Sequence, residues 1–247
     1  MLAMLLTLFR LEILKARRSL ALMVMLACPL MVVLLNTGML LRQAGWDGIS
    51  PAAWSSFWMG NRALWCYFML PLYLALCTAL VNGAEHRQHG WRLMLTLPVS
   101  ARQLYVAKLL LALAMLAIAH CSLLLLATGA AALLSDGNVL VQPAWSMAGA
   151  LLAALLASLP ILVLQHSLSW ASQNIVLPLA VGVCATMGII QLGSSEYWRL
   201  FPWSYPIMAS NGGDLELRDT ALTFGLSGGV ALFALSVWWA GRRRQPA

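Results

Sequence analysis

The sequence predicts an all-α, polytopic membrane protein. Of its 247 residues, 62% are hydrophobic and 9% are charged, and the mean hydropathy is +0.82. Soluble domains carry about 25% charged residues, so these proportions exclude a water-soluble domain. Several apolar runs are also long enough to cross a hydrocarbon layer of about 30 Å, which takes about 20 helical residues.

Six apolar runs are predicted to span the membrane. They cover residues 19–41, 63–81, 104–134, 145–164, 175–192 and 221–240. Four prolines lie inside these runs, at Pro29, Pro71, Pro160 and Pro178. They predict kinks and do not argue against helices, because neighbouring helices can satisfy the carbonyls that a proline leaves free. Residues 19–247 are therefore predicted to form one six-span domain.

Residues 1–18 are predicted to form an interfacial helix that connects to the first span. The side chains expected to dip into the inner leaflet are Leu2, Leu6, Phe9 and Ile13, and basic residues follow them. A secretory signal peptide is not expected, because its positive residues would precede the apolar run and a small-residue cleavage site would follow. The alternative is a frayed, cytoplasmic start to the first span.

The distribution of Lys and Arg predicts that both termini are cytoplasmic. With the amino terminus inside, most basic residues lie in cytoplasmic segments, and the arginines outside are Arg42, Arg62, Arg199 and Arg218. The net charge of +7 is therefore interpreted as reflecting the basic residues on the cytoplasmic side of the membrane. Nucleic-acid binding is not expected, since no folded basic domain is present to carry it.

A polar segment at about residues 85–101 is predicted to be a cytoplasmic coupling element. The mostly apolar residues 91–97 make one or two turns of helix, and Pro98 then denies the helix a backbone donor. Ser100 and Gln103 match a capping box, so a new helix is predicted to start there. Two helices should therefore meet at an elbow near Pro98.

Glu85 is an acidic residue among the basic residues of this segment. It could pair with Arg87, Arg92 or Lys108, or accept hydrogen bonds from the backbone of the elbow. The alternative is an exposed charge that merely ends the preceding helix.

The external segment at about residues 193–220 is predicted to be broken into short pieces, because it contains Pro202 and Pro206. Its aromatic residues are Tyr197, Trp198, Phe201, Trp203 and Tyr205. Such rings anchor a protein at headgroup depth, and a ligand-binding cluster is the alternative. The first external loop, residues 43–61, is similarly aromatic.

No catalytic or metal site is predicted. The five cysteines lie within apolar runs, where neither a disulfide framework nor a spaced zinc site can be recognised. His120 lies beside Cys121 deep in the third run, and an intramembrane histidine is a functional candidate. One interhelical hydrogen bond explains it, and a metal, a haem or a proton relay are the alternatives.

Residues 85–110 resemble a known family. They contain, in order, Glu85, Gly90, a Leu-rich turn at 93–97, Pro98, Ser100 and Lys108. This order is similar to the pattern that ABC-2 type transporter permeases carry after their second span. More narrowly, WRLMLTLPVSARQLYVAKLL resembles the corresponding segment in permeases of lantibiotic-immunity and bacitracin-resistance exporters, although the commoner Arg after the Pro-x-Ser elbow is displaced here to Arg102.

The resemblance implies a transport subunit of a bacterial inner membrane that works with a separate ATPase. The lysines of this chain are Lys15 and Lys108, and neither lies in a P-loop, so ATP and Mg²⁺ belong to the partner and no cofactor is expected here. The implied assembly contains two ATP-binding subunits, a second permease that is identical or related, and membrane lipid. The residues implied to couple to the ATPase are Glu85, Arg87, Trp91, Arg92, Leu93, Met94, Leu97 and Pro98. Those expected at a substrate path or external gate are His120, Tyr197, Trp198, Phe201 and Trp203.

The implied activity is export of a lantibiotic-like peptide or another amphipathic substrate. A haem or lipid exporter subunit and a non-transporting anchor or assembly subunit are the alternatives. A membrane-embedded enzyme would need polar groups that converge, whereas His120, Gln165, His166 and Gln191 are scattered, without an HExxH motif or a GxSxG nucleophile elbow.

Overall fold

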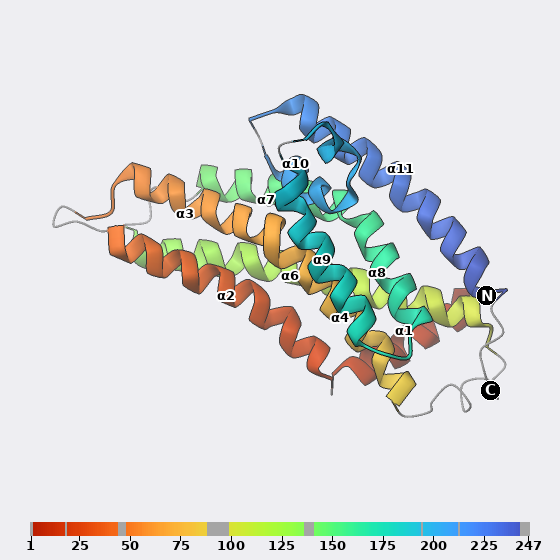
Figure 1. The fold of residues 1–247 in the computed structure, drawn as a ribbon. Coiled ribbons are helices and arrows are strands. Elements are labelled where there is room, and N and C mark those ends of the chain that lie inside the picture. The colour runs from red at the N-terminus through yellow and green to blue at the C-terminus, as the bar shows by residue number, and fades with distance from the viewer. Residues whose placement is uncertain are drawn as a thin grey trace.

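The computed structural model describes residues 2–17, 19–43, 48–87, 99–135, 141–193, 195–211 and 213–242, and the elements in these ranges are helices (Figure 1). This confirms the predicted all-α class. In chain order the elements are α1 (Leu2–Ala16), α2 (Leu20–Gln43), α3 (Pro51–Leu64), η1 (Trp65–Met69), α4 (Leu70–Arg87), α6 (Ala101–Leu134), α7 (Val141–Ala157), α8 (Leu159–Ala171), α9 (Val176–Leu192), η2 (Glu196–Leu200), η3 (Pro202–Ser204), α10 (Tyr205–Ser210) and α11 (Leu215–Ala240).

Within the described ranges, four helical stretches are long and apolar enough to cross a membrane. They are Leu20–Gln43, Pro51–Gly83, Ala101–Leu134 and Leu215–Ala240. The pair Gln142–Ala157 and Leu159–Ala171 can count as a fifth span, bent by 46°. α9 is apolar but has only 17 residues. The structure thus contains four to five candidate spans, whereas the sequence predicts six.

The second half of the predicted first external loop is a helix, so that prediction is wrong for these residues. Ser50 caps α3 by accepting a hydrogen bond from the Ala53 amide, and Pro51 occupies the first turn. Ala53, Phe57 and Asn61 recur every four residues and are buried, which fixes the inward face of α3. The helix then continues through the π-helix η1 into α4.

The bend between α7 and α8 confirms the kink predicted near Pro160. α7 ends at Ala157, and Pro160 lies in the first turn of α8, where a missing backbone donor costs no intrahelical bond. Pro178 occupies the same kind of position in α9, so it interrupts no helix interior. The predicted fourth span, 145–164, is therefore two helices that meet at a break around Ser158.

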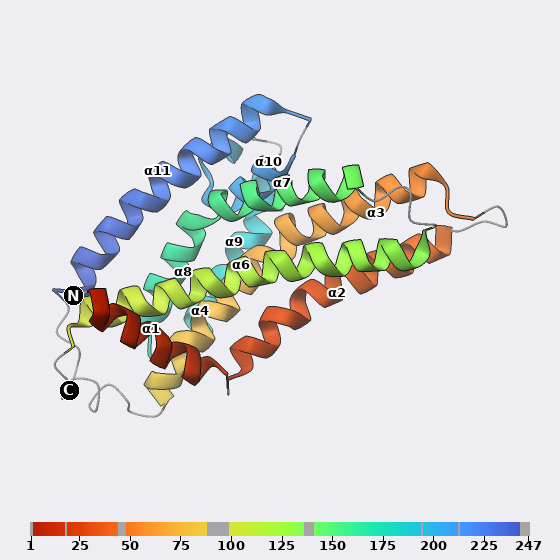
Figure 2. The same ribbon diagram turned by 180° about the vertical axis from the view of Figure 1, so that it is seen from behind.

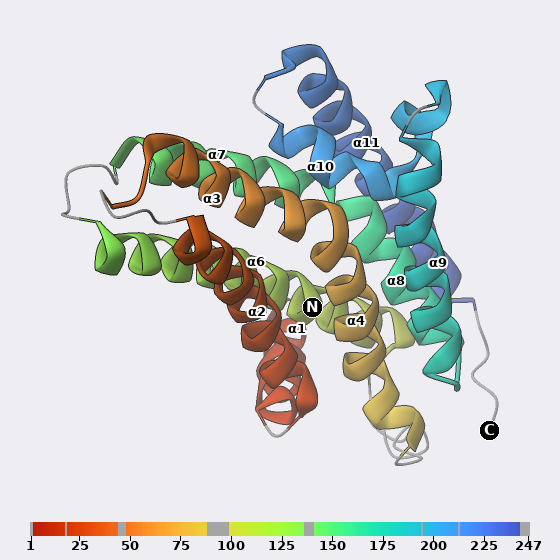
Figure 3. The ribbon, with the colours of Figure 1, turned by 60° about the vertical axis from the view of Figure 1, so that its left-hand side comes forward.

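α6 is the central helix of the bundle. It packs against α1, α2, α4, α7, α8 and α11. Tyr105, Leu116 and Leu123 along it are fully buried. α4 packs against α2 and also against α8 and α9, and Figure 3 shows α8 and α9 on the side of α4 away from α2.

α11 approaches the break between α7 and α8 through two glycines. A Cβ atom on Gly225 would lie 2.7 Å from the Ala157 Cα, and one on Gly229 would lie 2.8 Å from the Leu159 Cβ. Small residues four positions apart let membrane helices pack backbone to backbone. The bend is therefore held directly against α11.

α1 crosses the start of α6 (Figure 2). Its buried face consists of Leu8, Glu12 and Ala16. Leu6 is exposed, in agreement with the predicted lipid-facing stripe, but Phe9 and Ile13 pack against the core. The predicted stripe is therefore only partly exposed, because the bundle covers one side of this helix.

Candidate functional site

A buried ion pair joins α1 to α6. The Lys108 Nζ lies 2.8 Å from the Glu12 Oε2, and the two side chains are 1% and 3% exposed. The same ammonium donates a hydrogen bond of 3.0 Å to the Val81 carbonyl of α4. Lys15, which is 43% exposed, binds the other carboxylate oxygen of Glu12 at 2.8 Å. We call Glu12, Lys15, Lys108 and Val81 the charge node.

The charge node keeps Glu12 ionised despite its burial. Burial alone would raise the pKa of the Glu12 carboxyl, but the charges and hydrogen bonds of Lys108 and Lys15 outweigh it, and the net pKa is lowered. Removing one partner of such a pair would leave an uncompensated buried charge, which is strongly destabilising. The pair therefore ties α1, α4 and α6 together.

A second polar cluster joins α4, α6 and α8. Its residue on α4 is Asn82, which directly follows Val81 of the charge node. The Asn82 Nδ2 lies 3.1 Å from the His166 Nδ1, and the His166 Nε2 lies 3.3 Å from the Tyr105 carbonyl. The neutral tautomer with its proton on Nε2 satisfies both contacts, because Nδ1 then accepts from the amide and Nε2 donates to the carbonyl. The Tyr105 hydroxyl also contacts the Ser167 Oγ at 2.9 Å.

Both clusters lie on the helices that flank residues 88–98. α4 leads into this segment and ends at Arg87, while α6 leads out of it and begins at Ala101. At the start of α6, the Ser100 Oγ accepts from the Gln103 amide at 3.3 Å, and the Gln103 Oε1 accepts from the Ser100 amide at 3.0 Å. This confirms the predicted capping box.

Comparison with protein families identifies the chain. A family described as ABC-2 family transporter protein matches residues 8–189. The chain belongs to this ABC-2 family. It is therefore a multi-pass membrane permease, a non-catalytic transport subunit of the kind that pairs with ATP-binding cassette subunits. A search of curated proteins found no match.

The permease residues predicted to couple to the ATPase lie mostly outside the described residues. Glu85 and Arg87 belong to the last turn of α4, but the structure describes only their backbone. The others, Trp91, Arg92, Leu93, Met94, Leu97 and Pro98, fall within the undescribed segment 88–98. Lys108, one of the possible partners named for Glu85, is buried in the charge node, where it pairs with Glu12 of α1.

His120 of the permease is engaged in a hydrogen-bonded pair with Trp65. Its Nδ1 lies 2.9 Å from the Leu116 carbonyl, and its Nε2 accepts from the Trp65 Nε1 at 3.4 Å. Both ring nitrogens therefore have partners: the bond to the Leu116 carbonyl lies within α6, and the bond from the Trp65 indole is the interhelical one, whereas a carbonyl or hydroxyl is the partner expected from the sequence. No group of three His, Cys, Asp or Glu side chains in the described ranges could hold a metal ion.

The aromatic residues predicted at an external gate do not form one site with His120 in the described structure. Tyr197 is 69% exposed on η2, whereas Trp203 is 8% exposed and stacks on Phe201 at 5.5 Å. Phe201 and Trp198 approach Gly188 and Gly193 of the α9 end. No ring contact or hydrogen bond within the described residues joins this group to His120. The segment is broken into η2, η3 and α10, as predicted.

Sequence reasoning missed Glu12, Asn82 and Tyr105. Glu12 carried a usable signal, because it sits between Leu8 and Ala16 at intervals of four residues on a helix. A carboxylate on the apolar face of a helix needs a buried cation. Asn82 and Tyr105 carried no such signal, since their partners are distant in sequence.

Proposed function

We propose that this permease is the membrane subunit of an ABC exporter that moves a lantibiotic-like peptide or a similar amphipathic substrate. In this proposal, two permeases, identical or related, stand above two ATP-binding subunits in a bacterial inner membrane. The substrate class is supported by the resemblance of residues 91–110 to lantibiotic-immunity permeases. The cargo path runs between the two permeases.

The observation that carries the proposal is the position of the charge node. Residues 88–98 contact the ATPase, and any movement of this segment acts on α4 and α6, which flank it. Lys108 on α6 bonds to Glu12 on α1 and to the Val81 carbonyl of α4, so these three helices move together as one body. Helices that move together in this way are suited to alternating access by rigid-body rearrangement.

The proposed topology has six spans and cytoplasmic termini. It counts the bent pair α7–α8 as one span and α9 as another. α9 is about 25 Å long at 1.5 Å per residue, slightly less than a hydrocarbon core of about 30 Å. The excess of Lys and Arg near residues 10–18, 87–108 and 242–244 supports the inward placement. In this orientation residues 85–101 lie on the cytoplasmic side, where an ATPase can reach them.

The experiment compares coupling variants of the permease co-expressed with its ATP-binding subunit. The measured quantities are recovery of the ATPase with the permease, ATP turnover and cellular resistance to a peptide antibiotic. Trp91→Ala is expected to weaken assembly by about 2 kcal/mol or more if the ring fills a groove on the ATPase. Glu85→Gln is expected to leave assembly intact and uncouple turnover from resistance.

Trp145→Ala is the matched control, because this tryptophan is 73% exposed and belongs to α7, which does not flank residues 88–98. It should leave all three readouts unchanged. The permease purified alone should hydrolyse no ATP. Wild-type behaviour of both coupling variants in every assay would show that residues 85–98 do not transmit ATP hydrolysis.

A further inference from the structure

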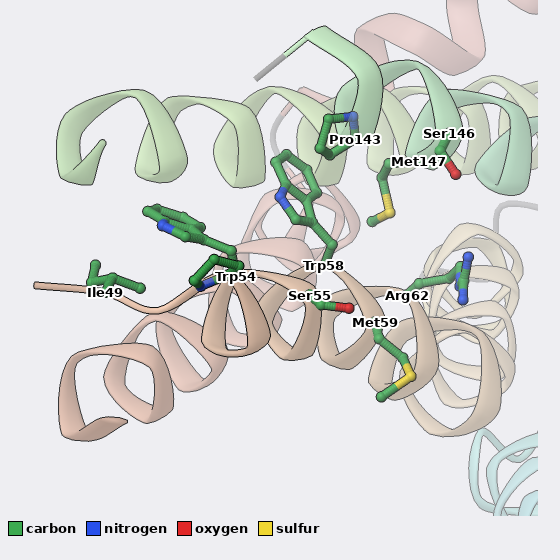
Figure 4. Close-up of a pocket in the computed structure, with 10 residues that line it drawn as sticks. Ile49, Trp54, Ser55, Trp58, Met59, Arg62, Pro143, Ser146 and Met147 are labelled. Carbon is green, nitrogen blue, oxygen red and sulfur yellow. The ribbon is translucent and has the colours of Figure 1, made fainter. Parts of the chain in front are cut away.

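A hollow of about 550 Å³ lies between α3 and α7 (Figure 4). α3 lies at the opposite end of the bundle from α1, which carries Glu12 of the charge node (Figure 1). Its size is typical of small-molecule sites. The residues that line it include Trp54, Trp58, Met59 and Arg62 from α3, and Pro143 and Met147 from α7. Neither the transport proposal nor the family match assigns a role to it.

Arg62 is the charged residue in the lining of this hollow. Its guanidinium has five donors. Among the described residues, no carboxylate pairs with it and no side chain or carbonyl accepts its hydrogen bonds. The guanidinium is therefore available to an anionic acceptor on a ligand that enters the hollow. Arginine binds phosphate in a bidentate manner and with strong, charge-assisted hydrogen bonds.

The other lining residues are mostly apolar, so they favour a ligand that also carries an apolar group. Trp54 and Trp58 come from consecutive turns of α3, and Met147 faces them from α7 (Figure 4). Met59 in the lining is 57% exposed, and Trp145, next to the lining residue Ser146, is 73% exposed. In a membrane protein such exposed apolar side chains face lipid. The hollow therefore opens towards the amphiphiles of the bilayer.

We propose that this hollow binds an anionic phospholipid. Arg62 holds the phosphate, and the two indole rings flank the glycerol and the first part of the acyl chains. The remaining chain length lies along the exposed surface of α3 and α7. This inference goes beyond the transport proposal, because binding requires neither the ATPase nor a nucleotide.

The test uses the full chain in lipid nanodiscs without nucleotide. Brominated phosphatidylglycerol and brominated phosphatidylcholine are titrated separately, and quenching of tryptophan fluorescence reports their binding. The wild-type chain should prefer the anionic lipid by about tenfold, which corresponds to about 1.4 kcal/mol. Trp54→Phe together with Trp58→Phe should remove the saturable part of the quenching, which assigns it to the hollow.

Arg62→Gln should abolish the preference, whereas Arg62→Lys should keep part of it. Arg42→Gln is the matched control, because Arg42 lies in the last turn of α2, is exposed and does not line the hollow. Ser146→Trp places a bulky side chain in the hollow and should block binding even if Arg62→Gln does not fold. Chromatography of each variant checks that the compared proteins are folded.

Three outcomes would overturn the proposal. One is equal affinity of the wild-type chain for both lipids. Another is an equal loss of preference in Arg62→Gln and Arg42→Gln. The third is competition by free glycerol phosphate as strong as that of the phospholipid, which would identify a soluble anion as the ligand. None of these results depends on ATP turnover, so a failure here is distinct from a failure of the transport proposal.

Discussion

Glu12 and Lys108 form a pair whose two members depend on each other. Glu12→Gln removes the Glu12 carboxylate from the buried Lys108 ammonium. We expect the free energy of unfolding to fall by about 3–5 kcal/mol. Thermal unfolding of the purified permease in detergent measures the change. Replacing both residues by leucine should recover most of the loss, because an apolar pair leaves no buried charge.

The control for this variant is Glu216→Gln. Glu216 pairs with Arg199 at 3.0 Å, but the two side chains are 76% and 52% exposed. Exposed pairs contribute less than about 1 kcal/mol, so this variant should unfold almost as the wild type does. Equal stability of the Glu12 and Glu216 variants would contradict the structural role of the charge node.

Acid should weaken the charge node in a defined direction. The pKa of the Glu12 carboxyl is lowered from 4.5 in the folded chain, so the unfolded chain binds the proton at a higher pH. The contribution of Glu12 to stability is therefore complete above pH 4.5 and is lost as the pH falls through the lower, folded pKa.

Thermal unfolding of the wild type and Glu12→Gln, from about pH 7 to about pH 3, measures this dependence. The difference between the two proteins should shrink as the pH falls, because a protonated Glu12 resembles glutamine. A difference that stays constant or grows towards acid pH would show that the carboxylate is not the stabilising species.

At the scale of elements, α11 and the α7–α8 bend depend on the absence of side chains at two positions. Gly225→Ala would place a Cβ 2.7 Å from the Ala157 Cα, a backbone atom that cannot move alone. We expect a loss of about 1–3 kcal/mol, as overpacked cores show. The loss in thermal stability measures it.

Gly228→Ala is the matched control in the same helix. Its Cβ would lie 3.7 Å from the Pro160 Cγ, which is ordinary contact. Alanine also has a better helix propensity than glycine, by about 1 kcal/mol. This variant should therefore be as stable as the wild type or more so. If Gly225→Ala behaves in the same way, α11 does not pack closely against the bend.

At the scale of the whole molecule, the distribution of basic residues predicts the orientation. In a cysteine-free background, a cysteine at Gln88 should react with an impermeant reagent only after the cells are opened. A cysteine at Asn211, which is exposed between α10 and α11 in the segment predicted to be external, should react in intact cells. Labelling of Gln88→Cys from outside would reverse the orientation and remove the basis for ATPase docking at residues 85–101.

The sequence by itself determined the all-α membrane class and the start of α6. The class follows from composition, since so few charged residues cannot cover a soluble domain of this size. The start of α6 follows from Ser100 and Gln103, because a capping box involves residues three positions apart. Such local features are visible in a sequence because neighbouring residues are close in any fold.

The tertiary structure alone decided which helix faces meet. Glu12 and Lys108 are 96 residues apart, and Asn82 and His166 are 84 residues apart. Hydrophobic periodicity marks the buried face of a helix in a soluble protein, but a membrane helix is apolar on all sides. Its inward face is therefore identified by a few polar and small residues, and their partners become known only when the helices are packed together.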